Sequence, residues 1–187
     1  TRSLLGNGLV LAEGDEWRQN RREIEPVFHP SRMLEYQRVM QSHTDSLLNS
    51  YSDGEVISLE QEMKGLTLTI IVDALFGVDI NEESWELEPA FKTILNHFER
   101  VSQTYVYLPE WIPTPKNRAY RNALETLDAA VNAIIDSHEV GKMAEETVLG
   151  QLLGSESDWA HTQLRDEIVT LLVAGHETTA LMLTFTG

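Results

Sequence analysis

The residues Val173–Ala180, with the sequence VAGHETTA, place polar groups inside a stretch that otherwise has the pattern of a buried apolar helix. Glycine costs about 1 kcal/mol relative to alanine in a helix interior, and a buried charge needs a partner or a changed protonation state. The Thr178 hydroxyl can bond back to the Ala174 carbonyl, or reach a water in a loosened helix turn. Glu177 beside it can take up or release a proton. The stretch therefore predicts a proton relay in a water-poor pocket.

The small residues Ala174 and Gly175 precede this relay. With only a methyl group at 174 and no side chain at 175, a flat body such as haem can lie against the helix backbone. A zinc site fits the His-Glu pair poorly, because a zinc peptidase helix needs a second histidine where Ala180 stands. No serine lies in the glycine pattern of a nucleophile elbow, and the sequence GNG at residues 6–8 is too generic to predict phosphate binding.

A second motif lies near the N-terminus, where Trp17 and Arg21 stand four residues apart on one face of a predicted helix. Taken alone, such a pair is most often an ordinary packed tryptophan and a solvated arginine. Buried threonines bonded to their own helix are also common, so Thr178 alone is no stronger evidence. Only the combination of the two motifs in one chain distinguishes a functional site from ordinary packing.

The combination resembles one family. Ala174–Thr179 resembles the oxygen-activation stretch of the long central helix in cytochrome P-450 monooxygenases, and Trp17-x-x-x-Arg21 resembles that family's haem-propionate helix. The order and separation of the motifs also fit, and the resemblance covers essentially all 187 residues. Three shorter features agree with it: Gly8-Leu9 before the GDEW stretch, Pro26-x-Phe28 after it, and LFG at Leu75–Gly77.

The resemblance implies a role for each motif residue. Arg21 would offer its guanidinium group to a propionate of haem b, and Trp17 would add an indole N–H from the same face. Thr178 would hydrogen-bond the bound oxygen or its water, and Glu177 would connect that water to solvent. Arg22 is a second, weaker propionate candidate.

Ala174 and Gly175 would border the haem and the substrate cavity. His176 is not expected to bind iron, because the family uses a cysteine thiolate. The chain contains no cysteine, and in the family that cysteine, its glycine-rich loop and a Glu-x-x-Arg helix lie downstream. No residue of this chain is therefore predicted to bind the metal. We expect residues 1–187 to form a single incomplete domain, cut at both ends and inactive by itself: the N-terminal and central part of a P-450 catalytic domain.

The full-length parent would then be a haem-thiolate monooxygenase. It would accept electrons from a donor protein of reductase or ferredoxin type, activate O2 and hydroxylate a lipophilic small-molecule substrate. The sequence AGHETT resembles that of the fatty-acid and xenobiotic hydroxylase branches more than that of the camphor-type branch. The alternative is a non-catalytic, all-helical interaction module or a degenerate relative. That alternative accounts for the helices, the acidity and the missing cysteine, but not for the glycine and glutamate inside the last helix.

The elements that must position these residues are predicted to be mainly α-helical, and no linker divides the chain. Caps, apolar spacing and breakers place helices at about residues 16–26, 31–52, 59–77, 88–101, 115–141 and from 162 past 180. A strand is considered only at Glu55–Leu59. The predicted N-terminal caps are Asp15, the Ser58–Gln61 capping box, and Thr114 before Pro115.

Apolar spacing also predicts buried faces. The segment at 66–76 is apolar nearly all round, so its helix is expected to be central. His97, His138 and His161 are expected to be surface or partly buried residues without a role. The predicted apolar side of the second helix is Met33, Val39, Met40, Leu47 and Leu48, and that of the helix after Pro115 is Ala123, Leu127, Ala130, Val131 and Ile134.

Composition limits the partners. With 14 Lys and Arg against 30 Asp and Glu, the formal charge of -16 argues against a nucleic-acid surface. The longest apolar run, residues 168–174, is far shorter than the roughly 20 residues of a membrane span, so no transmembrane segment is predicted. We expect this segment to be soluble and to face the cytoplasm, and a membrane anchor upstream of Thr1 stays open.

Overall fold

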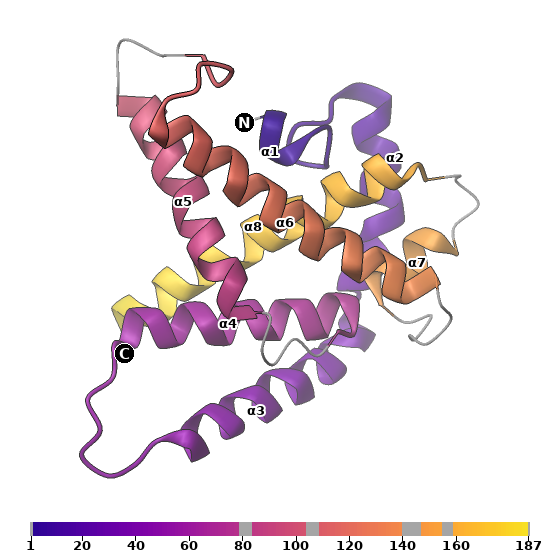
Figure 1. The fold of residues 1–187 in the computed structure, drawn as a ribbon. Coiled ribbons are helices and arrows are strands. Elements are labelled where there is room, and N and C mark those ends of the chain that lie inside the picture. The colour runs from indigo at the N-terminus through magenta and orange to yellow at the C-terminus, as the bar shows by residue number, and fades with distance from the viewer. Residues whose placement is uncertain (1, 79–83, 104–108, 140–146, 155–158, 187) are drawn as a thin grey trace.

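The computed structural model describes residues 2–78, 84–103, 109–139, 147–154 and 159–186. In these ranges the chain is helical with short loops and contains no strand. The mainly α fold predicted from the sequence is therefore confirmed. The elements are α1 (Arg2–Leu5), α2 (Gly14–Ile24), the 3₁₀ helices η1 (Glu25–Phe28) and η2 (Pro30–Arg32), α3 (Met33–Ser50), α4 (Leu59–Phe76), α5 (Ser84–Gln103), α6 (Pro115–Glu139), α7 (Val148–Leu153) and α8 (His161–Thr186) (Figure 1).

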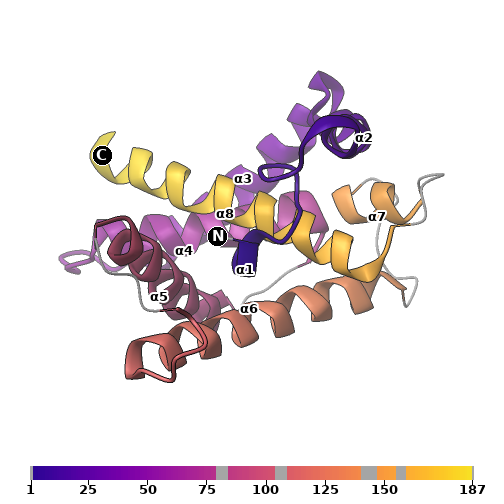
Figure 2. The ribbon, with the colours of Figure 1, turned by 90° about the horizontal axis from the view of Figure 1, so that it is seen from above.

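Helix α8 lies at the centre of the arrangement. Helix α4 runs beside it, α6 crosses it, and the short α1 contacts it near its beginning (Figures 1 and 2). Helices α5 and α6 pack together as a pair, while α3 contacts α4 on the outer side. Because α8 is held by several elements at once, the VAGHETTA stretch in its second half has a fixed orientation relative to them.

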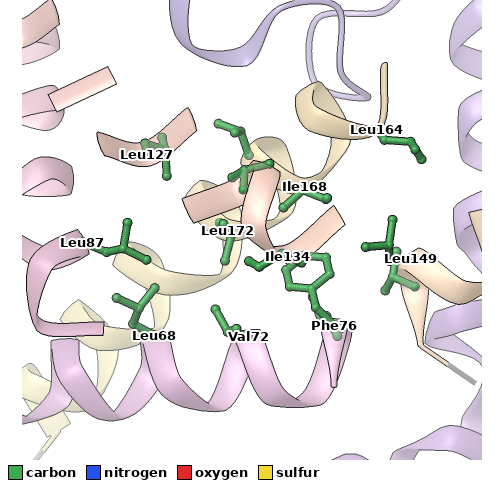
Figure 3. Packing of buried hydrophobic residues seen from close by; sticks show 14 of the residues in the cluster. Leu68, Val72, Phe76, Leu87, Leu127, Ile134, Leu149, Leu164, Ile168 and Leu172 are labelled. Carbon is green, nitrogen blue, oxygen red and sulfur yellow. The ribbon is translucent and has the colours of Figure 1, made fainter. Parts of the chain in front are cut away.

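The core lies where α4, α6 and α8 meet (Figure 3). Each fully buried leucine or phenylalanine there contributes about 1.5–3 kcal/mol relative to an exposed position. The predicted stripe on α6 is buried at four of its five positions, and α4 is central as expected. The residues that meet at this point are Leu68, Val72 and Phe76 of α4, Leu127 and Ile134 of α6, and Leu164, Ile168 and Leu172 of α8.

Two of the predicted helix ends follow the sequence signals. Gly77 ends α4 in the left-handed conformation, with φ of 66°, and its N–H donates to the Asp73 carbonyl. The Thr114 hydroxyl accepts from the Asn117 N–H at 3.1 Å and so caps α6 as predicted. Both signals are local, because the residue at the helix terminus itself makes the capping bond.

The predicted Asp15 cap is wrong, and the Ser58–Gln61 capping box opens its helix as predicted but lacks the capping bond. Helix α2 begins at Gly14 with Glu13 as its N-cap, and Asp15 lies in the first turn, where it pairs with Arg18. Ser58 does occupy the N-cap of α4, but its side chain makes no capping hydrogen bond. A first-turn carboxylate still interacts favourably with the helix dipole, which is why α2 forms without the predicted cap.

Further predictions need correction. Residues 55–58 carry no regular structure and Leu59 already begins α4, so the strand is absent; a strand also needs a neighbouring strand to satisfy its backbone, and the described ranges contain none. Helices α1 and α7 were not predicted, because both are too short for a periodic signal. The expected apolar side of α3 is largely exposed, with Leu48 at 61%, and Tyr36 is the buried residue of that helix.

Gly175 leaves space for a side chain of α4. A Cβ added to Gly175 would lie 2.2 Å from Cδ1 of Ile71 on α4, far inside van der Waals contact. The missing side chain at 175 therefore makes room for α4. Helix packing accounts for this glycine, whose cost in a helix interior is about 1 kcal/mol.

This contact yields a matched pair of glycine substitutions. Gly65→Ala should raise the free energy of unfolding by up to about 1 kcal/mol, because nothing lies within 4 Å of the added Cβ and alanine favours the helix. The free energy of unfolding of Gly175→Ala should be about 1–3 kcal/mol lower than that of Gly65→Ala, because the new Cβ displaces the Ile71 side chain. Urea unfolding of the full-length protein measures both.

The control removes the obstructing atom. In the background of Ile71→Val, which lacks Cδ1, Gly175→Ala should recover the loss and behave like Gly65→Ala. If the two glycine substitutions have equal effects without Ile71→Val, α4 does not obstruct position 175.

Candidate functional site

The predicted propionate pair lies on the open face of α2. The guanidinium carbon of Arg21 lies 5.5 Å from the centre of the Trp17 ring, within cation–π range, and both side chains are exposed. No hydrogen-bond or ion-pair partner for Arg21 lies in the described part of the chain. The Trp17 ring thus holds Arg21 while leaving its N–H groups available to an external anion.

A buried carboxyl group joins α2 to α8. Glu167 of α8 is only 1% exposed; its Oε1 accepts from the Asn20 side chain at 2.7 Å and its Oε2 from the Leu9 N–H at 3.0 Å. Burial raises the pKa of Glu167, and these two hydrogen bonds oppose the rise. Our sequence interpretation missed this residue. An acidic residue at the head of the apolar run 168–174 was the available signal.

The loop containing GNG packs on the same part of α8. A Cβ on Gly8 would lie 2.6 Å from the Asp166 carbonyl oxygen, and Gly6 has a positive φ of 51° and lies against the Asp166 carboxylate. The Asn7 N–H donates to that carboxylate at 2.8 Å. These glycines therefore let the N-terminal loop pack against α8. This packing accounts for the GNG motif without a phosphate-binding role.

One side of α8 stays open beyond its contact with α2. Seven residues make almost two helical turns, so Ala174 lies on the same side of α8 as Glu167, about 10 Å further along. We call this side the α8 ledge. Its most exposed residues are large and apolar, with Met182 at 69% and Phe185 at 85%. The α8 ledge consists of Ala174, Thr178, Leu181, Met182 and Phe185.

The Thr178 hydroxyl lies on the α8 ledge and bonds back to its own helix. Its Oγ1 donates to the Ala174 carbonyl oxygen at 2.7 Å, one of the two geometries expected from the sequence. Because the hydroxyl proton is used in this bond, the oxygen faces the ledge as an acceptor. In this geometry Thr178 accepts a hydrogen bond from a water or another donor above the ledge.

Glu177 lies beside the ledge and pairs with α4. Its Oε1 lies 3.9 Å from the Lys64 ammonium nitrogen, and Lys64 also donates to Glu60 at 2.7 Å. The Glu177 side chain is 23% exposed, so it has access to solvent as a proton relay requires. Glu177 is therefore partly open to solvent and next to Thr178 in sequence, with its carboxylate near Lys64 of α4, and its relay role stays a prediction.

His176 points into the protein. It is 1% exposed, its Nε2 donates to the Lys64 carbonyl oxygen at 3.1 Å, and its ring centre lies 5.1 Å from that of Phe91. Burial lowers the pKa of His176 to about 4, which keeps the ring neutral at neutral pH. His176 therefore contacts α4 and the core and does not face the ledge.

His97 is another buried residue that sequence reasoning missed. It stacks on Tyr120 with ring centres 3.8 Å apart, and its Nδ1 accepts from Arg100 at 2.9 Å. The expected surface or partly buried position of His97 is therefore wrong, because the residue is buried where α5 packs against α6. It also lines a pocket of about 350 Å³ between these helices. His161 is exposed as expected, and the side chain of His138 lies outside the described residues.

The ledge and α2 fit a flat apolar body with an acidic edge. Haem b has this form, since its macrocycle is apolar and its propionates are anionic. Ala174 has only a methyl group to set against a macrocycle, and the free Arg21 guanidinium could bind a propionate. Gly175 lies on the α4 side, so its predicted border with haem stays a prediction. The fit does not extend to the iron, because the chain has no cysteine.

A family model described as cytochrome P450 matches residues 2–186. The chain belongs to the cytochrome P450 family. Members of this family use haem b, which agrees with the fit of the α8 ledge. The predicted family is therefore confirmed, while the roles of individual site residues stay predictions.

Curated relatives carry oxygenase names. The P450 chain is 30% identical to a pentalenene oxygenase of Streptomyces avermitilis, over 98% of the chain and 42% of that protein. It is 28% identical to a cyclooctat-9-en-7-ol 5-monooxygenase of Streptomyces melanosporofaciens, over 98% of the chain and 41% of that protein. The chain thus spans about two fifths of the length of the curated relatives it matches.

Solved structures agree with the fold. The P450 chain superimposes on a retinoic acid-bound cyanobacterial CYP120A1 with a TM-score of 0.79 at 24% identity, covering 95% of this chain and 40% of the other. It superimposes on CYP102L1 with a TM-score of 0.77 at 22% identity, covering 96% and 44%. At these identities the likeness shows the fold.

Helix α8 is long and apolar enough to cross a membrane by length and composition alone. The same length and composition occur in the core helices of globular proteins. In this P450 chain α8 is contacted by α1, α4 and α6, and it carries Glu167 and His176 in buried, hydrogen-bonded positions. These contacts hold one side of α8, while 33% of its most apolar window is buried and the ledge residues are exposed.

The burial of His176 gives a pH prediction. The unfolded chain binds a proton at His176 below about pH 6.5, and the folded chain binds it only below about pH 4. The contribution of neutral His176 to the free energy of unfolding is therefore fully present above pH 6.5 and is lost as the pH falls from 6.5 to 4. The loss should reach about 3 kcal/mol. The raised pKa of Glu167 acts in the opposite sense, because the folded state retains that proton longer.

His176→Gln isolates the histidine contribution, since glutamine can still donate to the Lys64 carbonyl but does not titrate. The difference in unfolding free energy between wild type and variant should change between pH 6.5 and 4 and be constant above pH 7. Urea unfolding at a series of pH values measures it. A difference that does not vary with pH would show that His176 titrates normally in the folded protein.

Proposed function

We propose that this chain is the N-terminal and central part of the catalytic domain of a haem-thiolate monooxygenase, and that residues 1–187 are an incomplete domain. The single observation that carries the proposal is the open α8 ledge, with the Thr178 hydroxyl on it and the exposed Arg21 on the adjoining α2. Membership in the cytochrome P450 family and the oxygenase names of the relatives support it. Haem, when bound by a cysteine thiolate, supplies the chemistry of dioxygen activation.

The residues of this chain would orient the cofactor and handle protons. Arg21 binds one propionate through its guanidinium N–H groups, and Trp17 holds the arginine by a cation–π contact. Thr178 accepts a hydrogen bond from water above the ledge, because its own proton is bonded to Ala174. Glu177 exchanges protons between that water and solvent. A body that covers the apolar ledge in the full-length protein would exclude bulk water from this path.

The substrate would be a lipophilic small molecule that receives one oxygen atom from O2, with electrons from a reductase or ferredoxin type of donor. The exposed apolar residues of the ledge support an apolar cavity wall, and the names of the relatives include pentalenene and cyclooctat-9-en-7-ol. Large exposed apolar residues on the ledge and on α3 support an incomplete domain, because isolated domains rarely leave such a set uncovered.

The proposal is tested first in the coding sequence after Gly187. We expect a Glu-x-x-Arg helix and then a glycine-rich loop with a cysteine, and the full-length protein should show the reduced carbon-monoxide spectrum of thiolate-ligated haem. A stop codon before these features would instead favour a degenerate relative without the chemistry.

Arg21→Ala in the full-length protein should weaken haem retention by about tenfold or more, because it removes a charge-assisted hydrogen bond of about 1.5–3 kcal/mol. The haem-to-protein absorbance ratio after extended dialysis measures this loss. Arg18→Ala is the matched control, since Arg18 lies on the same helix but pairs with Asp15. Full haem occupancy in Arg21→Ala would argue against a propionate contact.

Thr178→Ala should raise the peroxide released per electron pair consumed about fivefold, because the water above the ledge loses an acceptor worth about 1 kcal/mol. Peroxide and hydroxylated product are measured together in the full-length enzyme. Thr178→Ser keeps the hydroxyl and should stay near wild type, and Thr179→Ala controls for loss of a neighbouring exposed threonine. Unchanged coupling in Thr178→Ala would remove this residue from the relay.

A further inference from the structure

Lys64 of α4 contacts two consecutive residues of α8 in different ways. Its backbone carbonyl accepts from His176 at 3.1 Å, and its ammonium nitrogen lies 3.9 Å from the Glu177 carboxylate. The Lys64 side chain is 16% exposed, so the charge is held between the helices and does not extend into solvent. Lys64 thus contacts His176 through its backbone carbonyl and Glu177 through its charge.

The Lys64 charge is persistent and oriented. Glu60 lies one turn earlier on α4 and accepts from the ammonium group at 2.7 Å, which raises the pKa of Lys64. A glutamate four residues before a lysine is the favourable order for such a pair in a helix. Glu60 therefore keeps the ammonium group charged and places it where it reaches Glu177.

His176 fixes the backbone position from which Lys64 extends. A carbonyl oxygen can only accept, so the ring proton must lie on Nε2 in this contact. Gly175, the preceding residue, leaves room for the Ile71 side chain of α4. Three consecutive residues of α8 therefore meet α4, and two of them meet Lys64.

We propose that Lys64 is a positioning residue for the Glu177 carboxylate; this inference rests on the proposed function. At 3.9 Å the ammonium group attracts the carboxylate without a short hydrogen bond, and its short bond is to Glu60. The carboxylate therefore has a preferred position beside α4 and remains able to leave it to exchange a proton with water near Thr178. In this proposal Lys64 acts through Glu177, the residue of the relay that its ammonium group approaches.

The first test measures the contact by itself, through melting temperatures of the full-length protein. Lys64→Met and Glu177→Gln form a double-mutant cycle. If the pair interacts, Lys64→Met should lower the melting temperature less in the Glu177→Gln background than in wild type. Additive shifts would overturn the contact and with it the inference. Lys116→Met removes an exposed lysine on α6 and should add independently with Glu177→Gln.

The second test measures the relay, as peroxide released per electron pair. Lys64→Met should raise this ratio about two- to fivefold, since an ion pair of this kind shifts equilibria by about that factor. Lys64→Arg should restore it, because arginine keeps the charge. In the Glu177→Gln background, Lys64→Met should have no further effect, because Lys64 acts only through that carboxylate. A merely structural role would lower stability without moving this ratio.

The outcomes separate the two proposals. If Thr178→Ala changes the peroxide ratio and Lys64→Met does not, the relay stands and the role of Lys64 is overturned. If neither variant changes it, the relay itself is wrong and the role of Lys64 falls with it. The inference is supported if the melting temperatures of the Lys64→Met and Glu177→Gln cycle are not additive, and if Lys64→Met raises the peroxide ratio while Lys64→Arg keeps it near wild type.

Discussion

The contact between α4 and α8 is the constraint on which the site depends. Helix α8 can present Thr178 to one side only if its other side is firmly held, and α4 provides that hold. Gly175 leaves room for the Ile71 side chain of α4, and His176 adds a hydrogen bond to the Lys64 carbonyl. A helix that is apolar nearly all round, such as the second half of α4, is suited to this position, because it can contact α8 on one side and α3 on another.

A second attachment sets the distance between the two motifs. Trp17 and Arg21 lie on α2, which could slide along α8 if only apolar contacts joined them. The buried Glu167 carboxyl prevents this, because it accepts from Asn20 of α2 and from the Leu9 backbone at once. Leaving one of these donors or acceptors unpaired would cost about 1–3 kcal/mol, which makes the register of the two helices specific.

The sequence was sufficient for features that depend on local chemistry. The helix end at Gly77, the Thr114 cap and the shared helix face of Trp17 and Arg21 involve residues a few positions apart, and the structure agrees with each. It was insufficient where a residue meets a distant neighbour. Helical spacing shows which residues share a face with Gly175, but not that Ile71, 104 positions earlier, lies against it. The partners of Glu167 are even more distant, at 147 and 158 positions, which is why it was missed.

The four unusual residues of the VAGHETTA stretch divide into two pairs by what they contact. Gly175 and His176 face α4, and packing and a buried hydrogen bond account for them without any chemistry. Packing does not account for Thr178 or Glu177 in the same way, since one is exposed on the ledge and the other pairs at 3.9 Å with a lysine that already has a closer partner. An exposed threonine and a loosely held carboxylate add little stability. Their places beside an apolar ledge are those that the proposed proton relay requires of them.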